Sequence, residues 1–481
     1  MRRRLIPLAA ILVPAICAGA RLSAQVQQGG AARGTLVIAD PRATAITEYQ
    51  AALDAYQAWS WTEGYARAQR ALALDSSFGL ARALVARYRG GPNGEGERNR
   101  AAVDAARGSA AEAVTALAIR AGAGAGAPTL WDAAVALAPN DPRLALDRAL
   151  ALAGRARVDA LRETAKKFAD HAATKQWLGY YLTPNVDPGA NSADAAEAMA
   201  AVQDAVRLAA NTSGSHTAMA HVLARLGRED EALRHLQAAT SMTPTNEYAF
   251  RLRAEIHLHQ GKPADARVSM DSAIILADNI SQLELYRTQR ALTFLHEGNL
   301  PATVAAMEEN ARSLEIMGAP VTAASARLYL AMVLAGGNNA KAANEQVALA
   351  RRLGAGAVLL TDNSIIVYSL TRQGPAARQA LNEYLRLAHG AAPSEALQQN
   401  IHRMTGLTLL GEGKPTEAIA ELKQGGPNSY SQLGLIEAYV QLGDKKQVDA
   451  ERATFLARKD YVGNSTAAAI GRYRSMMAAK K

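Results

Sequence analysis

A spacing of small and apolar residues recurs after 34 residues, and this internal repeat constrains the fold more than any other feature. The first copy has Ala220, Leu223, Gly227, Ala232, Leu236 and Ala239; the second has Ala254, His257, Gly261, Ala266, Met270 and Ala273. Self-similarity at such a period is typical of helical repeat arrays, whose units cannot bury their apolar faces alone. The period therefore predicts an all-α architecture and leaves the bound partner undefined.

Each copy has the order of a helix hairpin. Ala220 and Leu223 lie on one helical stripe, and Gly227 is expected to end that helix in a short turn. Ala232 and Leu236 then begin a second stripe at the spacing of one helix face. Small residues at Ala220 and Ala232 would let the two helices approach closely, since a bulky residue there would overpack the contact.

This pattern resembles the tetratricopeptide repeat family, which has small residues at the hairpin crossing and a proline between repeats. Residues 213–246 match in the small residues and in Pro244, but lack the usual tryptophan and tyrosine of the first helix. The resemblance implies a right-handed superhelical α-solenoid of antiparallel helix hairpins. Weaker copies extend it over much of residues 45–470. The expected structural repeat positions are Ala220, Gly227, Ala232, Ala239, Pro244, Ala254, Gly261, Ala266, Ala273, Gly298, Gly406, Gly413 and Ala418.

The first 24 residues have the order of a secretory signal peptide. Arginines at positions 2–4 precede an apolar run over 5–20, and small residues lead to an expected cleavage site after Ala24. A transmembrane anchor is the alternative, but Pro7 and Pro14 and the short apolar run oppose it. We therefore expect export to the periplasm or the exterior. The single cysteine, Cys17, would be removed with the signal, so no disulfide would support the mature chain.

Composition breaks divide the chain into expected segments. Gly-rich stretches and a Pro/Gly-containing segment near residue 190 separate a divergent half from the more regular array. The expected organisation is a signal peptide at 1–24, a flexible leader at 25–44, a divergent helical-hairpin region at 45–190, a repeat array at 191–470 and a basic tail at 471–481.

The charge balance argues against nucleic-acid binding. The chain has a formal charge of +9, and removal of the four arginines in 1–24 would leave +5 without an evident basic cluster. The stretch 444–481 is an exception, with nine basic and four acidic residues. It predicts either a solvated terminal helix, whose basic residues complement the helix dipole, or a contact with an anionic membrane surface.

Motifs for catalysis are not evident. The sequence has no zinc-protease motif, phosphate-binding loop or nucleophile elbow. Gly214-Ser215-His216 suggests a nucleophile beside a base, yet Ser213 or Ser215 fits better as the start of a helix. His257 and His259 are two residues apart and would point to different faces of a helix. We expect no catalytic residues, no metal and no cofactor.

The family resemblance implies that first-helix residues on the inner side of the array contact the ligand. The matching positions are His221, Arg225, Arg251, Glu255, His259, His296 and Arg403. Most of these residues are basic, which predicts that the ligand is a peptide or protein segment with acidic side chains or a free carboxylate. The expected function is a non-catalytic exported scaffold. The alternative is an envelope-assembly component or an enzyme-associated subunit whose array supports chemistry at an unrecognised site.

Overall fold

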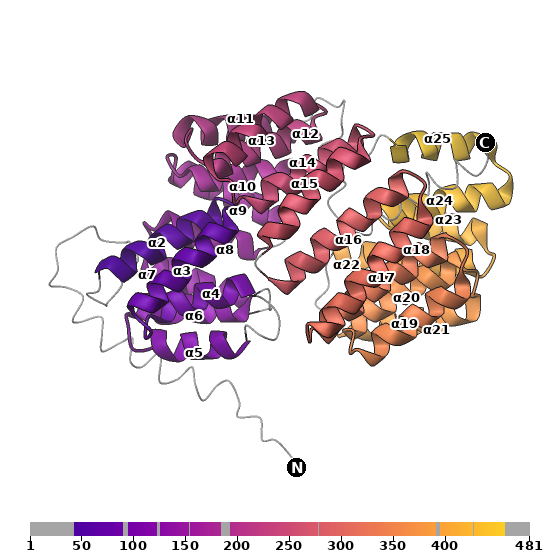
Figure 1. The fold of residues 1–481 in the computed structure, drawn as a ribbon, viewed down its shortest axis with the longest axis horizontal. Helices are drawn as coiled ribbons and strands as arrows, with labels where there is room; N and C mark the ends of the chain where they lie inside the picture. The colour runs from indigo at the N-terminus through magenta and orange to yellow at the C-terminus, as the bar shows by residue number, and fades with distance from the viewer. Residues whose placement is uncertain are drawn as a thin grey trace, which may run out of the picture. The chain divides into compact units, whose positions relative to one another are not determined.

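The computed structural model contains helices and turns and, within the residues it describes, no strand (Figure 1). The expected all-α class and its antiparallel hairpins are confirmed. The signal peptide, most of the leader, the residue-190 boundary and the basic tail lie outside the described residues. The structure describes residues 43–89, 95–122, 126–152, 154–183, 193–277, 279–390, 395–426 and 428–456.

The helices divide into two compact units, which we describe separately. Of the described residues, unit 1 holds those up to 183 together with 193–222 and 238–246. Unit 2 holds 223–237 and the described residues from 247 to 456. The boundary between the units falls within two helices, α12 (Ser213–Arg225) and α13 (Glu229–Met242), which contain the first copy of the internal repeat.

Unit 1 is built from consecutive helices that pack as hairpins, and its first seven helices, from residue 43 to 151, share one apolar core. Its core is rich in alanine, so neighbouring helices approach closely, and Tyr49, Phe78 and Trp131 fill the wider gaps. The helices are α2 (Ala43–Gln57), α3 (Trp61–Leu74), α4 (Gly79–Arg89), α5 (Glu95–Ala105), α6 (Ala110–Ala121), α7 (Ala127–Leu137), α8 (Pro142–Ala151), α9 (Gly154–Lys167), α10 (Ala172–Leu182) and α11 (Ala193–Leu208).

Unit 2 repeats the hairpin more regularly. The first helices of successive hairpins also contact one another, from α16 through α18, α20 and α22 to α24, and so form a continuous layer. The helices are α14 (Glu247–His259), α15 (Pro263–Leu276), α16 (Ile280–His296), α17 (Leu300–Ile316), α18 (Pro320–Gly336), α19 (Ala340–Arg352), α20 (Ala357–Leu370), α21 (Gly374–His389), α22 (Glu395–Gly411), α23 (Pro415–Gln424), α24 (Ser429–Leu442) and α25 (Lys445–Leu456).

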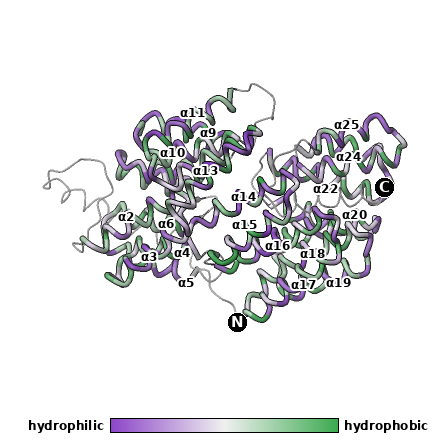
Figure 2. Tube along the Cα trace, turned by 45° about the horizontal axis from the view of Figure 1, so that its top comes forward, coloured by the Kyte–Doolittle hydropathy of each residue, from purple (hydrophilic) through white to green (hydrophobic). Residues whose placement is uncertain are grey.

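The repeat positions lie where the hairpins need small or turn-forming residues. Figure 2 shows hydrophobic and hydrophilic residues interspersed along the helices, as expected when each helix buries one face. A side chain at Gly406 would come within 2.6 Å of Leu422 Cγ. The alanines with no exposed surface are Ala220, Ala232, Ala239, Ala254, Ala266, Ala273 and Ala418. The turn glycines with positive φ are Gly227, Gly261, Gly298 and Gly413, and Pro244 is exposed in the turn after α13.

Candidate functional site

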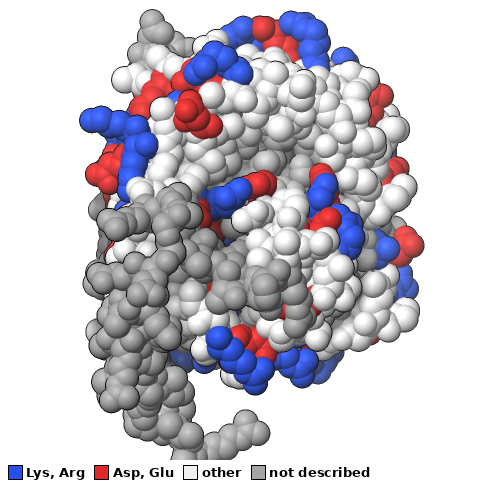
Figure 3. Space-filling model, turned by 90° about the vertical axis from the view of Figure 1, so that its left-hand side faces the viewer, with Lys and Arg blue, Asp and Glu red and all other residues white. Residues whose placement is uncertain are grey.

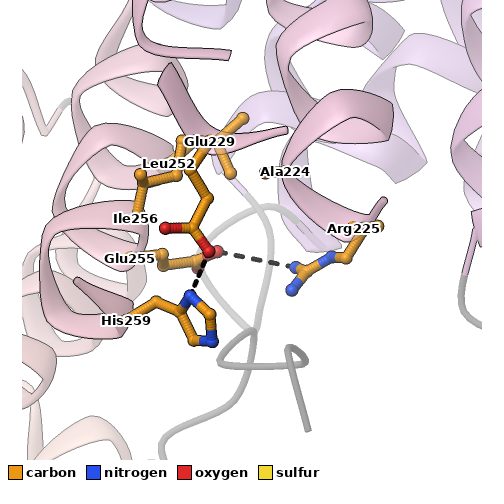
Figure 4. Close-up of a pocket in the computed structure, with 7 residues that line it drawn as sticks. All are labelled: Ala224, Arg225, Glu229, Leu252, Glu255, Ile256 and His259. Atoms are coloured by element: carbon orange, nitrogen blue, oxygen red, sulfur yellow. Dashed lines mark hydrogen bonds and ion pairs between the residues drawn. The ribbon is translucent and has the colours of Figure 1, made fainter. Parts of the chain in front are cut away.

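A small pocket in unit 2 lies where the end of α12, the start of α13 and one face of α14 meet (Figure 4). It is a hollow of about 250 Å³, a volume that includes open solvent and therefore does not describe an enclosed cavity. The lining residues are Ala224, Arg225, Glu229, Leu252, Glu255, Ile256 and His259.

The spacing of the α14 residues explains how one helix supplies most of the lining. Leu252, Glu255, Ile256 and His259 follow one another at offsets of three, four and seven, so they share one helical face. Leu252 and Ile256 are buried and form the apolar floor. The polar ends of Glu255 and His259 are therefore held over an apolar surface.

Glu255 joins two arginines of the site. Its Oε2 lies 3.6 Å from Arg225 Nη2, and its Oε1 lies 3.8 Å from Arg251 Nη2. All three side chains are buried, with at most 10% of any of them exposed. The Arg251 guanidinium also lies 4.8 Å from the ring centre of Tyr248, which orients it through a cation–π contact. Ion pairing offsets the cost of burying these charges.

His259 closes the pocket on its other side. Its Nδ1 contacts the Glu229 carboxylate, and Figure 4 shows this pair beside the ion pair of Arg225 with Glu255. Glu229 lies in the first turn of α13, where a carboxylate also complements the helix dipole. The lining therefore holds two basic and two acidic side chains, and is more balanced than the basic site that the sequence suggested.

His221 lies in unit 1, apart from this pocket. Only 2% of its surface is exposed, and its Nε2 lies 3.1 Å from Thr183 Oγ1. Its ring is 4.6 Å from that of Tyr180, centre to centre. The repeat spacing placed His221 on a first helix but could not show that it packs among aromatic rings.

His296 and Arg403 also lie away from the pocket. His296 is buried in the last turn of α16. Arg403 on α22 donates to Asn400, which contacts the Tyr384 hydroxyl. Burial lowers the pKa of Arg403, and burial raises the pKa of nearby Asp362 to about 6 although Arg403 opposes that change. The structure thus brings together Arg225, Arg251, Glu255 and His259 of the seven expected ligand residues.

The serine–histidine sequence at the start of α12 has a structural role in the described fold. Ser215 is fully buried, accepts from Gln176 Nε2 at 2.9 Å and donates to the Ala205 carbonyl at 3.2 Å. His216 Nε2 lies 3.0 Å from the Ala210 carbonyl. Within the described ranges no group of three or more His, Cys, Asp or Glu side chains is arranged to hold a metal ion.

Charged side chains elsewhere largely pair with one another. On the face drawn in Figure 3, basic and acidic side chains lie together in mixed groups. In unit 1, for example, Arg162 contacts Asp159, Asp194 and Glu197. Among the helices of the described residues, none combines the length and apolar character needed to cross a bilayer.

The sequence did not predict four of the seven residues that line the pocket. Glu229 escaped notice because the repeat pattern assigns ligand contacts to first helices, and Glu229 begins a second helix. Ala224, Leu252 and Ile256 are apolar, and nothing in the sequence distinguishes them from core residues. The acidic run at 229–231 was a weak signal, since it also suits the start of any helix.

No family model matches the sequence, and no curated protein matches it. The fold is similar to that of yeast Tom70, with a TM-score of 0.42 and 13% identity over 86% of this chain and 100% of that one. A tetratricopeptide repeat protein from Parabacteroides merdae has a TM-score of 0.36 and 14% identity, over 61% of this chain and 98% of that one. A human IFIT1 dimer with m7Gppp-AAAA has a TM-score of 0.42 and 13% identity, over 86% of this chain and 94% of that one. At this level the neighbours' partners do not transfer to the present chain.

Proposed function

We propose that the protein is an exported, non-catalytic scaffold that binds an extended protein or peptide segment through the inner helices of unit 2. The observation that carries this proposal is the pocket of Arg225, Glu229, Glu255 and His259 above the floor of α14. Helix-hairpin arrays present extended surfaces of this kind to their partners. Side chains of both signs suit a segment that offers donors and acceptors together, as peptide backbone does.

A carboxylate of the partner would enter near Arg225 and Arg251. Arg225 Nη2 lies 3.6 Å from Glu255 Oε2 and Arg251 Nη2 lies 3.8 Å from Glu255 Oε1, so two guanidinium groups supply positive charge at this end of the pocket. Glu229 and Glu255 would disfavour a uniformly acidic segment. We therefore expect a polar segment with isolated acidic residues or a terminal carboxylate.

The proposal is tested by crosslinking in cells followed by mass spectrometry of the captured proteins. The double variant Arg225→Gln with Glu255→Gln removes an ion pair from the pocket without changing net charge. The matched control is Arg228→Gln with Glu231→Gln, which removes an exposed ion pair on α13. We expect a partner captured by the wild type and the control to be lost from the pocket variant, by about tenfold or more.

Equal capture by both variants, with both folded, would contradict the assignment of the pocket.

The export proposal has its own readout. The mature protein recovered outside the cytoplasm should begin at Gln25, and a protein recovered with its first residues intact would contradict export.

A further inference from the structure

The pocket of unit 2 contains one side chain of a type that changes its charge near neutral pH. Histidine gains a proton as pH falls from about 8 to about 5, whereas ordinary arginine and glutamate side chains keep their charge over that range. Among the seven residues that line the pocket, His259 is the one histidine. The charge of the pocket therefore depends on pH through this residue.

Glu229 decides which nitrogen of the neutral His259 ring carries the proton. The Glu229 carboxylate contacts Nδ1, and an ionised carboxylate only accepts hydrogen bonds. Nδ1 must therefore donate, which leaves Nε2 as an acceptor while the ring is neutral. Nε2 lies on the side of the ring away from Glu229 (Figure 4). When the ring gains a proton, Nε2 becomes a second donor and the ring becomes a cation.

Protonation of His259 changes the balance of charge in the pocket. While the ring is neutral, the lining has the positive charge of Arg225 against the negative charges of Glu229 and Glu255. The imidazolium adds a second positive charge, so the excess of negative charge disappears. The floor of the pocket is apolar and buried, and a charge held over such a surface is screened less than one in open water.

Other charged groups reach this end of α14 from the helices that pack against it. Three of them belong to types that keep their charge between about pH 5 and pH 8. They are Asp230 on α13 and Lys262 and Asp265 at the start of α15. Two further histidines lie near: His257 on another face of α14, and His296 in the last turn of α16, which also contacts α14. Burial lowers the pKa of His257, so its titration is separated from that of His259.

We propose that His259 makes binding at this pocket depend on pH, so that an acidic segment binds more tightly below about pH 6 than above about pH 7. The inference rests on the peptide-binding function proposed above and adds its regulation. At acid pH the imidazolium offers a donor and a positive charge to a carboxylate of the partner, in the same pocket as Arg225. At neutral pH, Nε2 accepts instead, and the excess negative charge disfavours the carboxylate. Because binding and protonation are reciprocal, a bound carboxylate also makes His259 hold its proton more tightly.

The test uses the full chain and a rhodamine-labelled synthetic peptide of glycine and serine with one central glutamate, followed by fluorescence anisotropy at pH 5.5 and pH 7.5. The glutamate stays ionised at both values, since its ordinary pKa is about 4.3. The matched probe carries glutamine in its place. We expect the wild type to bind the glutamate peptide about fivefold or more tightly at pH 5.5, and the glutamine peptide equally at both values.

Three variants locate the pH dependence. His259→Gln should bind the glutamate peptide at both pH values only as tightly as the wild type does at pH 7.5. The matched control is His402→Gln, which removes a histidine whose Nδ1 lies 2.7 Å from Glu421 Oε2 on another hairpin of unit 2. This control and His296→Gln should both keep the full pH dependence.

A second readout covers the case in which His259→Gln fails to fold. In the wild type labelled with carbon-13 in its histidine rings, nuclear magnetic resonance follows the protonation of each ring between pH 5 and pH 8. The glutamate peptide should raise the titration midpoint of one ring. Glu229→Gln should lower the midpoint of the same ring, because it removes a carboxylate that favours the charged form.

The outcomes separate this inference from the proposed function. Equal binding of the glutamate peptide at both pH values, or no ring whose midpoint responds to the peptide, would overturn the pH dependence alone. If neither peptide binds at millimolar concentration at either pH, the proposed function fails and this inference fails with it.

Discussion

Units 1 and 2 hold the side chains between their helices by different interactions. In unit 1, rings contact rings around a buried tryptophan, and one arginine stacks on a tyrosine. In unit 2, ion pairs lie over an aliphatic floor on α14. The same kind of helix hairpin supports both. The same stacking of helices therefore supports two different kinds of side-chain packing between them.

Among substitutions that test this comparison, we expect the largest loss of stability at Trp59. Trp59→Ala would remove a buried ring that contacts Trp177 and Tyr180, and the resulting cavity should lower the unfolding free energy of unit 1 by about 3 to 5 kcal/mol. Urea denaturation followed by circular dichroism measures the loss. The control is Trp61→Ala, which truncates a half-buried tryptophan of the same unit. If Trp61→Ala lowers the unfolding free energy as much as Trp59→Ala does, the burial of the Trp59 ring does not explain the loss.

A smaller effect is expected in unit 2. Glu255→Gln removes the carboxylate that contacts two buried guanidinium groups, and should destabilise the unit by about 3 kcal/mol. Adding Arg225→Gln should recover part of this loss, because one buried charge is then removed with its partner. Thermal melting of the single and double variants measures both steps. A double variant less stable than Glu255→Gln would show that the ion pairs do not support the pocket.

The third effect concerns pH. Burial raises the pKa of Glu284 on α16 to about 7, and among the described residues the Thr288 hydroxyl counteracts it by donating to Glu284 Oε1 at 2.9 Å. The folded state therefore holds this proton more tightly than the unfolded state, so stability is full below about pH 4.5 and declines as pH rises toward 7. The decline attributable to Glu284 should be on the order of 3 kcal/mol.

Glu284→Gln should remove that part of the pH dependence and stabilise unit 2 above pH 7. Urea midpoints measured between pH 4 and pH 8 check it. Asp362 on α20, whose pKa burial raises to about 6, should contribute a slope of the same sign that survives in the Glu284→Gln variant. An unchanged profile in Glu284→Gln would place the titration elsewhere.

The sequence predicted the parts of the fold that a strict steric rule controls. Ala232 and Ala266 are fully buried, and Gly227 and Gly261 have positive φ, because close helix crossings and tight turns tolerate few other residues. The all-α class followed from that spacing. Helix bounds in the divergent N-terminal half were harder to predict, since its hairpins do not show the regular spacing of small residues.

The candidate sites were only partly predictable. The spacing put Arg225, Glu255 and His259 on first helices, and the structure brings them together. It could not anticipate Glu229, which reaches the pocket from a second helix, or the environment of His221 among aromatic rings. Both depend on contacts between residues distant in the sequence, about which a single chain's periodicity carries no information.

The most direct test of the account is hydrogen exchange with mass spectrometry on the full chain, with and without a partner identified by crosslinking. If the partner binds through the unit 2 pocket, amides of 223–237 and 247–259 should become protected on binding. The Arg225→Gln with Glu255→Gln variant should lose that protection at the same partner concentration. Protection confined to residues beyond 280, with these two segments unchanged, would contradict the central claim.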